Sequence, residues 1–152
     1  MSFKLFVSLF LLAFLYNCKI DDGLDCTVID CATEQLFSIE FLDEEGTNLI
    51  TNETYKLDTI EITTDGTSLE LIPLDSTKLV TFIIVGAIGE TSYSIKLNPN
   101  ETDTLVLTTV EPTTNINQCC TALPIIEKVS YNQKQKNIIQ MDNGFEKISV
   151  IK

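Results

Sequence analysis

The sequence predicts an all-β domain built as an antiparallel sandwich or barrel. Short segments alternate between apolar and polar residues with a period of two, as in residues 36–41 and 92–98. Turn signals such as Asp65-Gly66 and Asn98-Pro99-Asn100 separate these segments at intervals of about 8 to 15 residues. No stretch keeps the 3.6-residue period of an amphipathic helix. Together these observations favour strands throughout the domain.

The first element, residues 1–17, has the layout of a signal peptide. Lys4 precedes an apolar run over residues 5–16, and polar sequence begins at Asn17. About twelve apolar residues in a helix span roughly 18 Å, which is shorter than the ~30 Å hydrocarbon core of a bilayer. We therefore expect a cleaved export signal and not a membrane-spanning helix.

The cleavage site indicates a lipoprotein. Bulky residues 14–16 follow Ala13, so no pair of small residues marks an ordinary cleavage site. Leu15-Tyr16-Asn17-Cys18 instead resembles a lipobox, in which the signal peptide is cut before a cysteine that carries diacylglycerol. The tyrosine and asparagine of this tetrapeptide depart from the small residues of the usual motif. The alternative is that Cys18 is a further disulfide cysteine of a secreted protein.

The number of cysteines supports acylation at Cys18. The chain has five cysteines, so an exported protein would keep one unpaired. Removing Cys18 leaves an even set of four: Cys26, Cys31, Cys119 and Cys120. We predict that Cys26 and Cys31 each bond to one of Cys119 and Cys120, because a bond between adjacent Cys119 and Cys120 would close a strained ring. Which cysteine takes which partner stays open at this point, and a four-thiolate zinc site is the less favoured alternative.

The residues after Cys18 carry a family resemblance. Lys19-Ile20-Asp21-Asp22 is similar to the lysine-then-acid signal that directs lipoproteins of Bacteroidetes to the outer face of the outer membrane. Over about its first 22 residues, the chain resembles a Bacteroidetes-type surface-exposed outer-membrane lipoprotein. The resemblance implies acyl chains on Cys18 as the membrane attachment, and Lys19, Asp21 and Asp22 as the export signal. It also implies a lipid-anchored location in the outer membrane, facing the cell exterior.

The next elements are a tether and the first strands of a single domain. Residues 18–34 show little periodicity and predict a lipidated tether, so the β-sandwich domain comprises residues 35–152. A first strand begins at Leu36, with every second residue from Phe37 facing inward. Residues 55–63 alternate in the same way, and Asp65-Gly66 then predicts a hairpin into residues 68–72.

The remaining strands complete the sandwich. Residues 78–85 are almost continuously apolar or β-branched, which predicts a central strand that is covered on both faces. Further strands are expected over residues 92–98, 104–110, 125–132 and 145–151, with a polar loop over residues 132–137. Among the possible folds we favour an immunoglobulin-like sandwich of about seven to nine strands.

Charge excludes several classes of partner. Removal of residues 1–17 takes away Lys4 and no acidic residue, which changes the net charge from −12 to −13. Nucleic acid is not an expected partner, because neutralising phosphates requires clusters of lysine or arginine. Attraction to anionic lipid is excluded for the same reason, so acyl chains must supply the attachment to the membrane.

Motifs for catalysis are also missing. The chain has no histidine and no arginine, so the commonest general base, the commonest metal ligand and the bidentate anion clamp are lacking. Phosphate loops and the common metal motifs are not present either, and we expect no enzyme activity, cofactor or metal. The function we expect is a non-enzymatic surface protein that presents a β-sandwich for binding or adhesion to an unknown protein or glycan. The alternatives are an accessory subunit that docks an outer-membrane protein complex and, third, a hydrolase with paired carboxylates.

Overall fold

The computed structural model describes residues 31, 34–74, 78–85, 88–112, 120, 122–142 and 144–152. Residues 31–152 form one compact unit. Its helical element is the short 3-10 helix η2, Leu57–Thr59. The described residues form ten strands: β1 Leu36–Leu42, β2 Glu61–Thr64, β3 Thr67–Leu69, β4 Val80–Ile83, β5 Gly89–Asn98, β6 Glu101–Val110, β7 Ile125–Tyr131, β8 Lys134–Lys136, β9 Ile139–Gln140 and β10 Glu146–Ile151.

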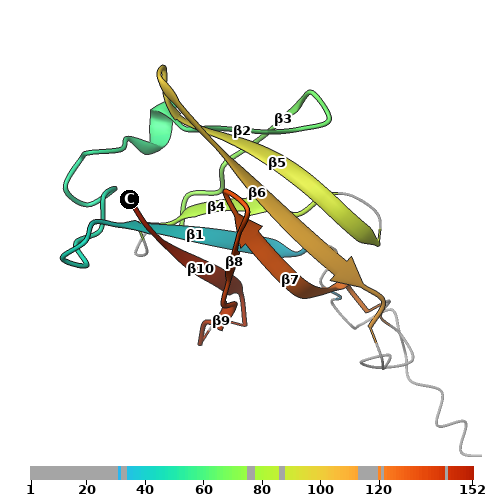
Figure 1. Ribbon diagram of the computed structural model, residues 1–152. Coiled ribbons are helices and arrows are strands. Elements are labelled where there is room, and N and C mark those ends of the chain that lie inside the picture. Colours follow the sequence, from blue (N-terminus) through green and yellow to red (C-terminus); the bar gives the residue numbers. More distant parts are fainter. Residues whose placement is uncertain are drawn as a thin grey trace, which may run out of the picture. The chain divides into compact units, whose positions relative to one another are not determined.

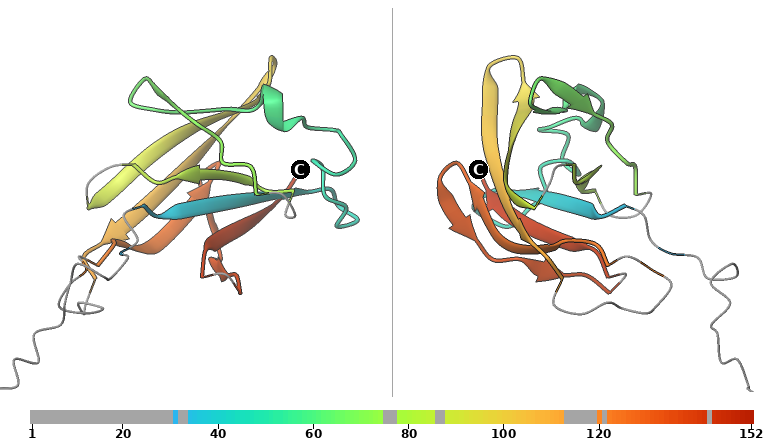
Figure 2. Two further views of the ribbon diagram at one scale, coloured as in Figure 1. Left: turned by 180° about the vertical axis from the view of Figure 1, so that it is seen from behind. Right: turned by 90° about the vertical axis from the view of Figure 1, so that its right-hand side faces the viewer.

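The strands form two sheets that pack as a sandwich (Figures 1 and 2). One sheet has four strands in the order β4-β1-β10-β9, and the other has six in the order β3-β2-β5-β6-β7-β8. The predicted all-β sandwich is therefore confirmed, with ten strands instead of seven to nine. The additional strands are β8 and β9, whose three and two residues are too few to show an alternating pattern.

One pair of strands departs from the antiparallel arrangement. The first and last strands, β1 and β10, lie side by side and run parallel, with Ile39 opposite Ile148 and Phe41 opposite Val150. The other strand pairs are antiparallel. Alternation of apolar residues shows which face of a strand is buried but not the direction of its neighbour, so this pairing has no local signal.

The core lies between the two sheets. As predicted, Phe37, Ile39 and Phe41 of β1 are fully buried, and the inward residues of β5 and β6 face them. Aromatic rings connect the sheets, because the ring of Phe41 lies 6.1 Å from that of Tyr131 in β7. Removing these apolar side chains from water is the main contribution to the stability of such a sandwich.

Two tight turns shape the six-stranded sheet. Asp65 and Gly66 both have positive φ angles, 49° and 77°, which gives the type I′ turn that Asp-Gly favours. The predicted β2–β3 hairpin is thus present. A second turn of the same kind joins β7 to β8, with φ angles of 47° at Asn132 and 64° at Gln133. This hairpin was not predicted, because glutamine is an unusual residue for such a turn.

The segment predicted as a strand over residues 55–63 is mostly a loop. Strand β2 begins only at Glu61, after the 3-10 helix. Tyr55 and Ile60 are nevertheless buried, with 7% and 5% of their surfaces exposed. The apolar residues therefore reflect a loop that inserts side chains into the core, which sequence alternation cannot distinguish from a strand.

Strand β4 lies at the edge of its sheet, so its predicted central position is wrong. It is nevertheless buried, because residues 71–72 cover part of that edge through a hydrogen bond of 2.8 Å from Ile72 N to Thr81 O. Thr81 is 1% exposed, and its hydroxyl bonds to that of Ser38 at 2.9 Å. Burial of Val80, Thr81 and Phe82 explains the continuous apolar run without a central position.

Candidate functional site

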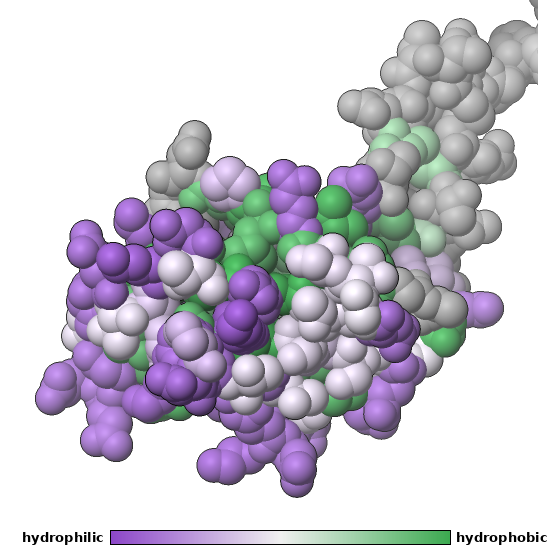
Figure 3. All heavy atoms as spheres, turned by 90° about the horizontal axis from the view of Figure 1, so that it is seen from above, coloured by the Kyte–Doolittle hydropathy of each residue, from purple (hydrophilic) through white to green (hydrophobic). Residues whose placement is uncertain are grey.

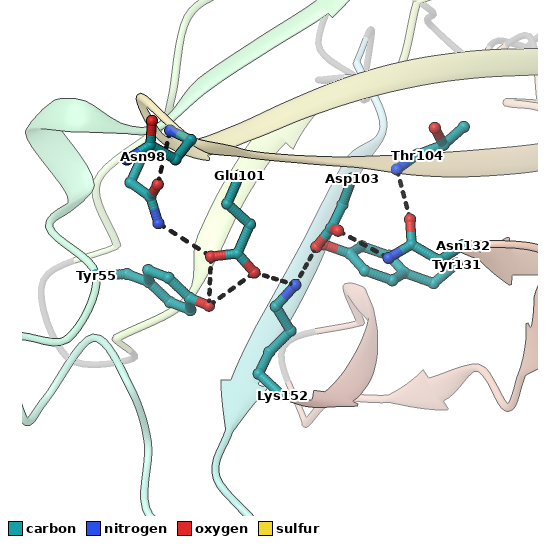
Figure 4. Close-up of polar contacts among 9 residues, drawn as sticks. Tyr55, Asn98, Glu101, Asp103, Thr104, Tyr131, Asn132 and Lys152 are labelled. Atoms are coloured by element: carbon teal, nitrogen blue, oxygen red, sulfur yellow. Dashed lines mark hydrogen bonds and ion pairs between the residues drawn. The ribbon is translucent and has the colours of Figure 1, made fainter.

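A cluster of charged and polar side chains lies at one end of the sandwich (Figure 4). Its centre is the Lys152 ammonium group, which contacts the carboxylates of Glu101 and Asp103 in β6. The distance from Nζ to Glu101 Oε1 is 2.6 Å. The Lys152 side chain is 14% exposed and that of Asp103 is 8% exposed, so this ion pair is largely removed from water.

Asp103 accepts hydrogen bonds on both of its oxygens. Tyr131 Oη donates to Oδ2 at 2.6 Å, and Asn132 Nδ2 donates to Oδ1 at 2.7 Å. Burial alone would raise the pKa of Asp103, but the bonds from Lys152, Tyr131 and Asn132 outweigh it and the pKa lies below its usual value. Burial, and then the hydrogen bond to Asp103, raises the pKa of Tyr131.

Glu101 connects the cluster to the loop before β2. Tyr55 Oη donates to its carboxylate at 3.0 Å, and Asn98 Nδ2 donates at 3.0 Å. Burial, and then the bond to Glu101, raises the pKa of Tyr55 to about 12. Burial lowers the pKa of Lys152, but the carboxylates of Asp103 and Glu101 raise it by a larger amount. The pKa of Lys152 therefore lies above its usual value.

These contacts give the cluster a structural role. A glycoside hydrolase needs one protonated carboxylic acid beside one carboxylate, so one pKa must be raised. The lowered pKa of Asp103 excludes it as the protonated acid of such a pair. Each of its oxygens already has a partner, and Lys152 neutralises part of the charge. The cluster therefore holds β6, β7 and the last residue of the chain together.

A second carboxylate pair lines a cavity of about 280 Å³ beside β10. The pair is Glu34 and Glu146, and the wall also includes Leu36, Leu123 and Phe145. Burial raises the pKa of Glu146, although the amides of Gln140 and Gln35 partly counteract it. The cavity is at the small end of the volumes that bind ligands.

An apolar groove lies between β3 and a wall that includes Ile83, Val85 and Ile88. Two hollows of about 640 and 530 Å³ form it, and they share Leu69 of β3 and Val85. Its apolar residues are Leu69, Leu71, Ile72, Ile83, Val85 and Ile88. Val85 and Ile88 are 37% and 47% exposed, although both are large apolar side chains, and both line the same hollow. Neighbouring exposed apolar side chains of this kind often mark an interaction site. Tyr93 Oη donates to the carbonyl of Val85 at 2.8 Å and so holds this wall in place.

Four carboxylates surround the apolar groove: Glu34, Asp65, Glu70 and Glu90. The described lining residues include no lysine. Figure 3, which views the molecule from above β2 and β3, shows apolar surface in a hollow between polar side chains. The groove is therefore an apolar site with a negatively charged rim.

The site residues predicted from sequence fall mostly in the part of the chain that the structure does not describe. Cys18, the export signal Lys19, Asp21 and Asp22, and the cysteines Cys26 and Cys119 all lie outside the described residues. Cys31 and Cys120 form a disulfide, with their Cα atoms 5.5 Å apart. This bond is one of the cross-pairings that the sequence allowed, and it leaves the pairing of Cys26 with Cys119 as a prediction.

The polar cluster and the groove were not predicted. A signal for the cluster was present, because extending the 104–110 strand backwards places Asp103 on the same inward face as Leu105. A carboxylate on a buried face needs a charged or hydrogen-bonding partner. No comparable signal marks the groove, because it forms between β3 and a segment distant from it in sequence.

Two absences are noted for the described residues. No group of three or more histidine, cysteine or acidic residues there is placed to hold a metal ion. The helical part of these residues contains nothing long and apolar enough to cross a bilayer. Comparison of the chain with protein-family models, with curated proteins and with solved structures gives no match.

Proposed function

We propose that this chain is a non-enzymatic, lipid-anchored protein of the cell surface whose β-sandwich binds a partner in the apolar groove. The observation that carries the binding role is the groove itself, with exposed Val85 and Ile88 inside a ring of carboxylates. Exposed apolar patches with polar rims are typical of interaction sites. The immunoglobulin-like type of sandwich belongs to the same proposal, because such folds place binding residues outside the core.

The lipid anchor rests on the sequence of residues 1–22. The mature protein should begin at Cys18 and carry diacylglycerol on its sulfur and an acyl chain, such as palmitate, on its amine. Intact mass of the protein from the membrane fraction tests this directly. A mature N-terminus at another residue, or Cys18 in a disulfide, would contradict the anchor.

Exposure at the cell surface has its own test. Protease added to whole cells should remove the domain, because Lys19, Asp21 and Asp22 direct the protein outward. A periplasmic protein of known location serves as the control and must survive the same treatment. A domain that is cleaved only after lysis would contradict the proposed orientation.

The binding role can be tested in intact cells with a photo-crosslinking residue at Ile88. The control carries the same residue at Ile151, which is more exposed, at 65%, and lies on β10 away from the groove lining. We expect a discrete adduct from Ile88 that Val85→Glu abolishes, and none from Ile151. Equal adducts from both positions, or none from Ile88, would contradict a partner in the groove.

The accessory-subunit alternative uses the same groove with a different partner. Mass spectrometry of the Ile88 adduct distinguishes the two, since an integral outer-membrane protein as the sole adduct would favour the subunit. A hydrolase is less well supported, because both carboxylate oxygens of Asp103 and both of Glu146 already accept hydrogen bonds from neighbouring side chains.

A further inference from the structure

We propose that β3 is the acceptor edge for an extended segment of a partner polypeptide that carries apolar and basic residues. The segment would add to the six-stranded sheet as a further strand beside β3. This inference rests on the proposed binding role of the groove and names the class of partner. Four observations carry it: an edge that no other described strand covers, its backbone register, the apolar groove and the charges around it.

Strand β3 ends the six-stranded sheet, and its partner within the sheet is β2. The two-residue turn places Thr64 opposite Thr67, followed by Thr63 opposite Ser68. Closing pairs of such hairpins are hydrogen-bonded, and the next pair is not. The N–H and C=O of Ser68 therefore point away from β2 and towards the open edge, where they can pair with another strand.

The opposite edge of the same sheet is built differently. Strand β8 follows the same kind of turn, but its first and last residues are Lys134 and Lys136, with Gln135 between them. Lysines on an edge strand oppose pairing with further strands, and proteins use them for this purpose. The residues of β3 are Thr67, Ser68 and Leu69, none of which is charged. The β8 edge of the sheet therefore carries lysines that oppose further strand pairing, whereas the β3 edge carries none.

The groove beside β3 specifies the side chains of the incoming strand. Successive residues of a strand point to opposite faces, so every second residue would enter the groove and contact Leu69, Val85 and Ile88. These positions require apolar residues. Asp65 and Glu70 lie at the two ends of β3, and Glu90 lies across the groove, so residues at its rim should be lysine or arginine.

A second copy of the same chain fits this edge poorly. The chain has a net charge of −12, so two copies repel each other. Its own basic edge, β8, has three residues, Lys-Gln-Lys, and no apolar residue to fill the groove. The chemistry therefore favours a foreign polypeptide segment, of the kind that joins exposed sheet edges in other recognition systems.

The test uses the full chain, purified from membranes in detergent, and a fluorescent peptide of about ten residues that alternates valine and lysine. Fluorescence anisotropy gives its affinity. We expect saturable binding that weakens with added salt, and no binding of a matched peptide in which glutamate replaces lysine. Binding of both peptides with equal affinity would overturn the charge requirement and with it the proposal.

Backbone pairing is tested by a matched pair of proline substitutions. Ser68→Pro removes the outward N–H of β3 and should weaken binding about tenfold or more. Gln135→Pro makes the same change at the middle of β8, after the same kind of turn, and should leave the affinity unchanged. Equal effects, or none at Ser68, would overturn strand addition. Because Ser68→Pro could unfold β3, a peptide with N-methylated backbone amides provides the same test on the unmodified protein.

The outcome separates this inference from the proposed function. If the Ile88 adduct forms on cells and Val85→Glu abolishes it, but the basic peptide does not bind, the groove binds a partner and strand addition is wrong. If the Ile88 adduct is also absent, the binding role itself is wrong. Affinity that depends on protein concentration, with dimers in the absence of peptide, would identify a second copy as the occupant and overturn the proposal.

Discussion

Tyr131 donates a hydrogen bond of 2.6 Å to Asp103 Oδ2, the same oxygen that pairs with Lys152. Both residues are buried, and they belong to the neighbouring strands β7 and β6. A buried carboxylate with these partners stabilises the fold only while all of them are present. Removing one partner leaves the charge without compensation, which costs more than the intact pair contributes.

Substitution of the cation should therefore be strongly destabilising. We expect Lys152→Met to lower the free energy of unfolding by about 2 to 4 kcal/mol, below the full range for buried pairs because Glu101 is partly exposed. The matched control is Lys96→Met, whose pair with Glu61 has side chains that are 42% and 59% exposed. That change should cost less than about 1 kcal/mol. Urea denaturation measures both, and equal losses would contradict a special role for Lys152.

The same cluster predicts how stability depends on pH. The folded pKa of Asp103 is lowered, so its contribution is complete above its ordinary pKa of about 3.9 and is lost as the pH falls below that value. The folded pKa of Lys152 is raised, so its contribution persists up to about pH 10.4 and is lost above it. Free energies of unfolding measured across this range should show a plateau with a decline on each side.

Part of the alkaline decline should come from one tyrosine. The pKa of Tyr55 is raised to about 12 in the folded protein, while an unfolded tyrosine titrates near about 10. Stability should therefore fall between these two values, and Tyr55→Phe should make that fall shallower. The substitution should also cost about 1 kcal/mol at neutral pH through the lost hydrogen bond to Glu101. An alkaline decline of unchanged slope would show that Tyr55 does not contribute.

Glu146 should behave in the opposite way from Asp103. Its pKa is raised by burial, so its ionised form costs stability at neutral pH, and that cost disappears as the pH falls below the folded pKa. Glu146→Gln should stabilise the protein at neutral pH, by less than about 1 kcal/mol after allowance for solvent screening. The matched control is Glu40→Gln, which should destabilise, because Lys147 and Ser149 overcome the effect of burial and lower the pKa of Glu40. The same sign for both substitutions in thermal denaturation would contradict this assignment.

The disulfide should contribute a large part of the stability. Cys31 and Cys120 are 89 residues apart, and closing a loop of that length contributes up to about 4 to 5 kcal/mol in the chain-entropy model. Replacing all four cysteines, Cys26, Cys31, Cys119 and Cys120, by serine should lose most of this in denaturation experiments without a reductant, because a remaining Cys26–Cys119 bond would still close a loop of similar length. In reducing buffer the two proteins should become equally stable. Non-reducing peptide mapping should also find Cys26 bonded to Cys119, and a peptide that joins Cys26 to another cysteine would contradict the cross-pairing.

Local chemistry predicted more of the fold than long-range pairing did. Asp65-Gly66 predicted its hairpin because few residues adopt two positive φ angles in succession. The turn at Asn132-Gln133 has the same geometry with less typical residues, so the sequence predicts only a polar loop there. The position of β4 at an edge could not be predicted, since its cover comes from residues 71–72 and not from a neighbouring full strand.

The functional surfaces were harder to predict for the same physical reason. Lys152 and Asp103 are 49 residues apart, and nothing near either residue indicates the other. The groove depends on how far β3 lies from Ile83, Val85 and Ile88, which is a property of the packed sheets. Only the inward position of Asp103 on β6 could have shown that a buried partner was required.

The parallel pairing of β1 with β10 has a mechanical consequence. It places the beginning of β1 and the end of β10 at opposite ends of one pair of strands. A tensile force between these two points acts along the strands and loads their hydrogen bonds together, in shear. In an antiparallel pair, the same two points would lie at one end of the strands, so a force between them would break the hydrogen bonds one after another. The two terminal strands of the sandwich are therefore arranged to resist extension along the chain.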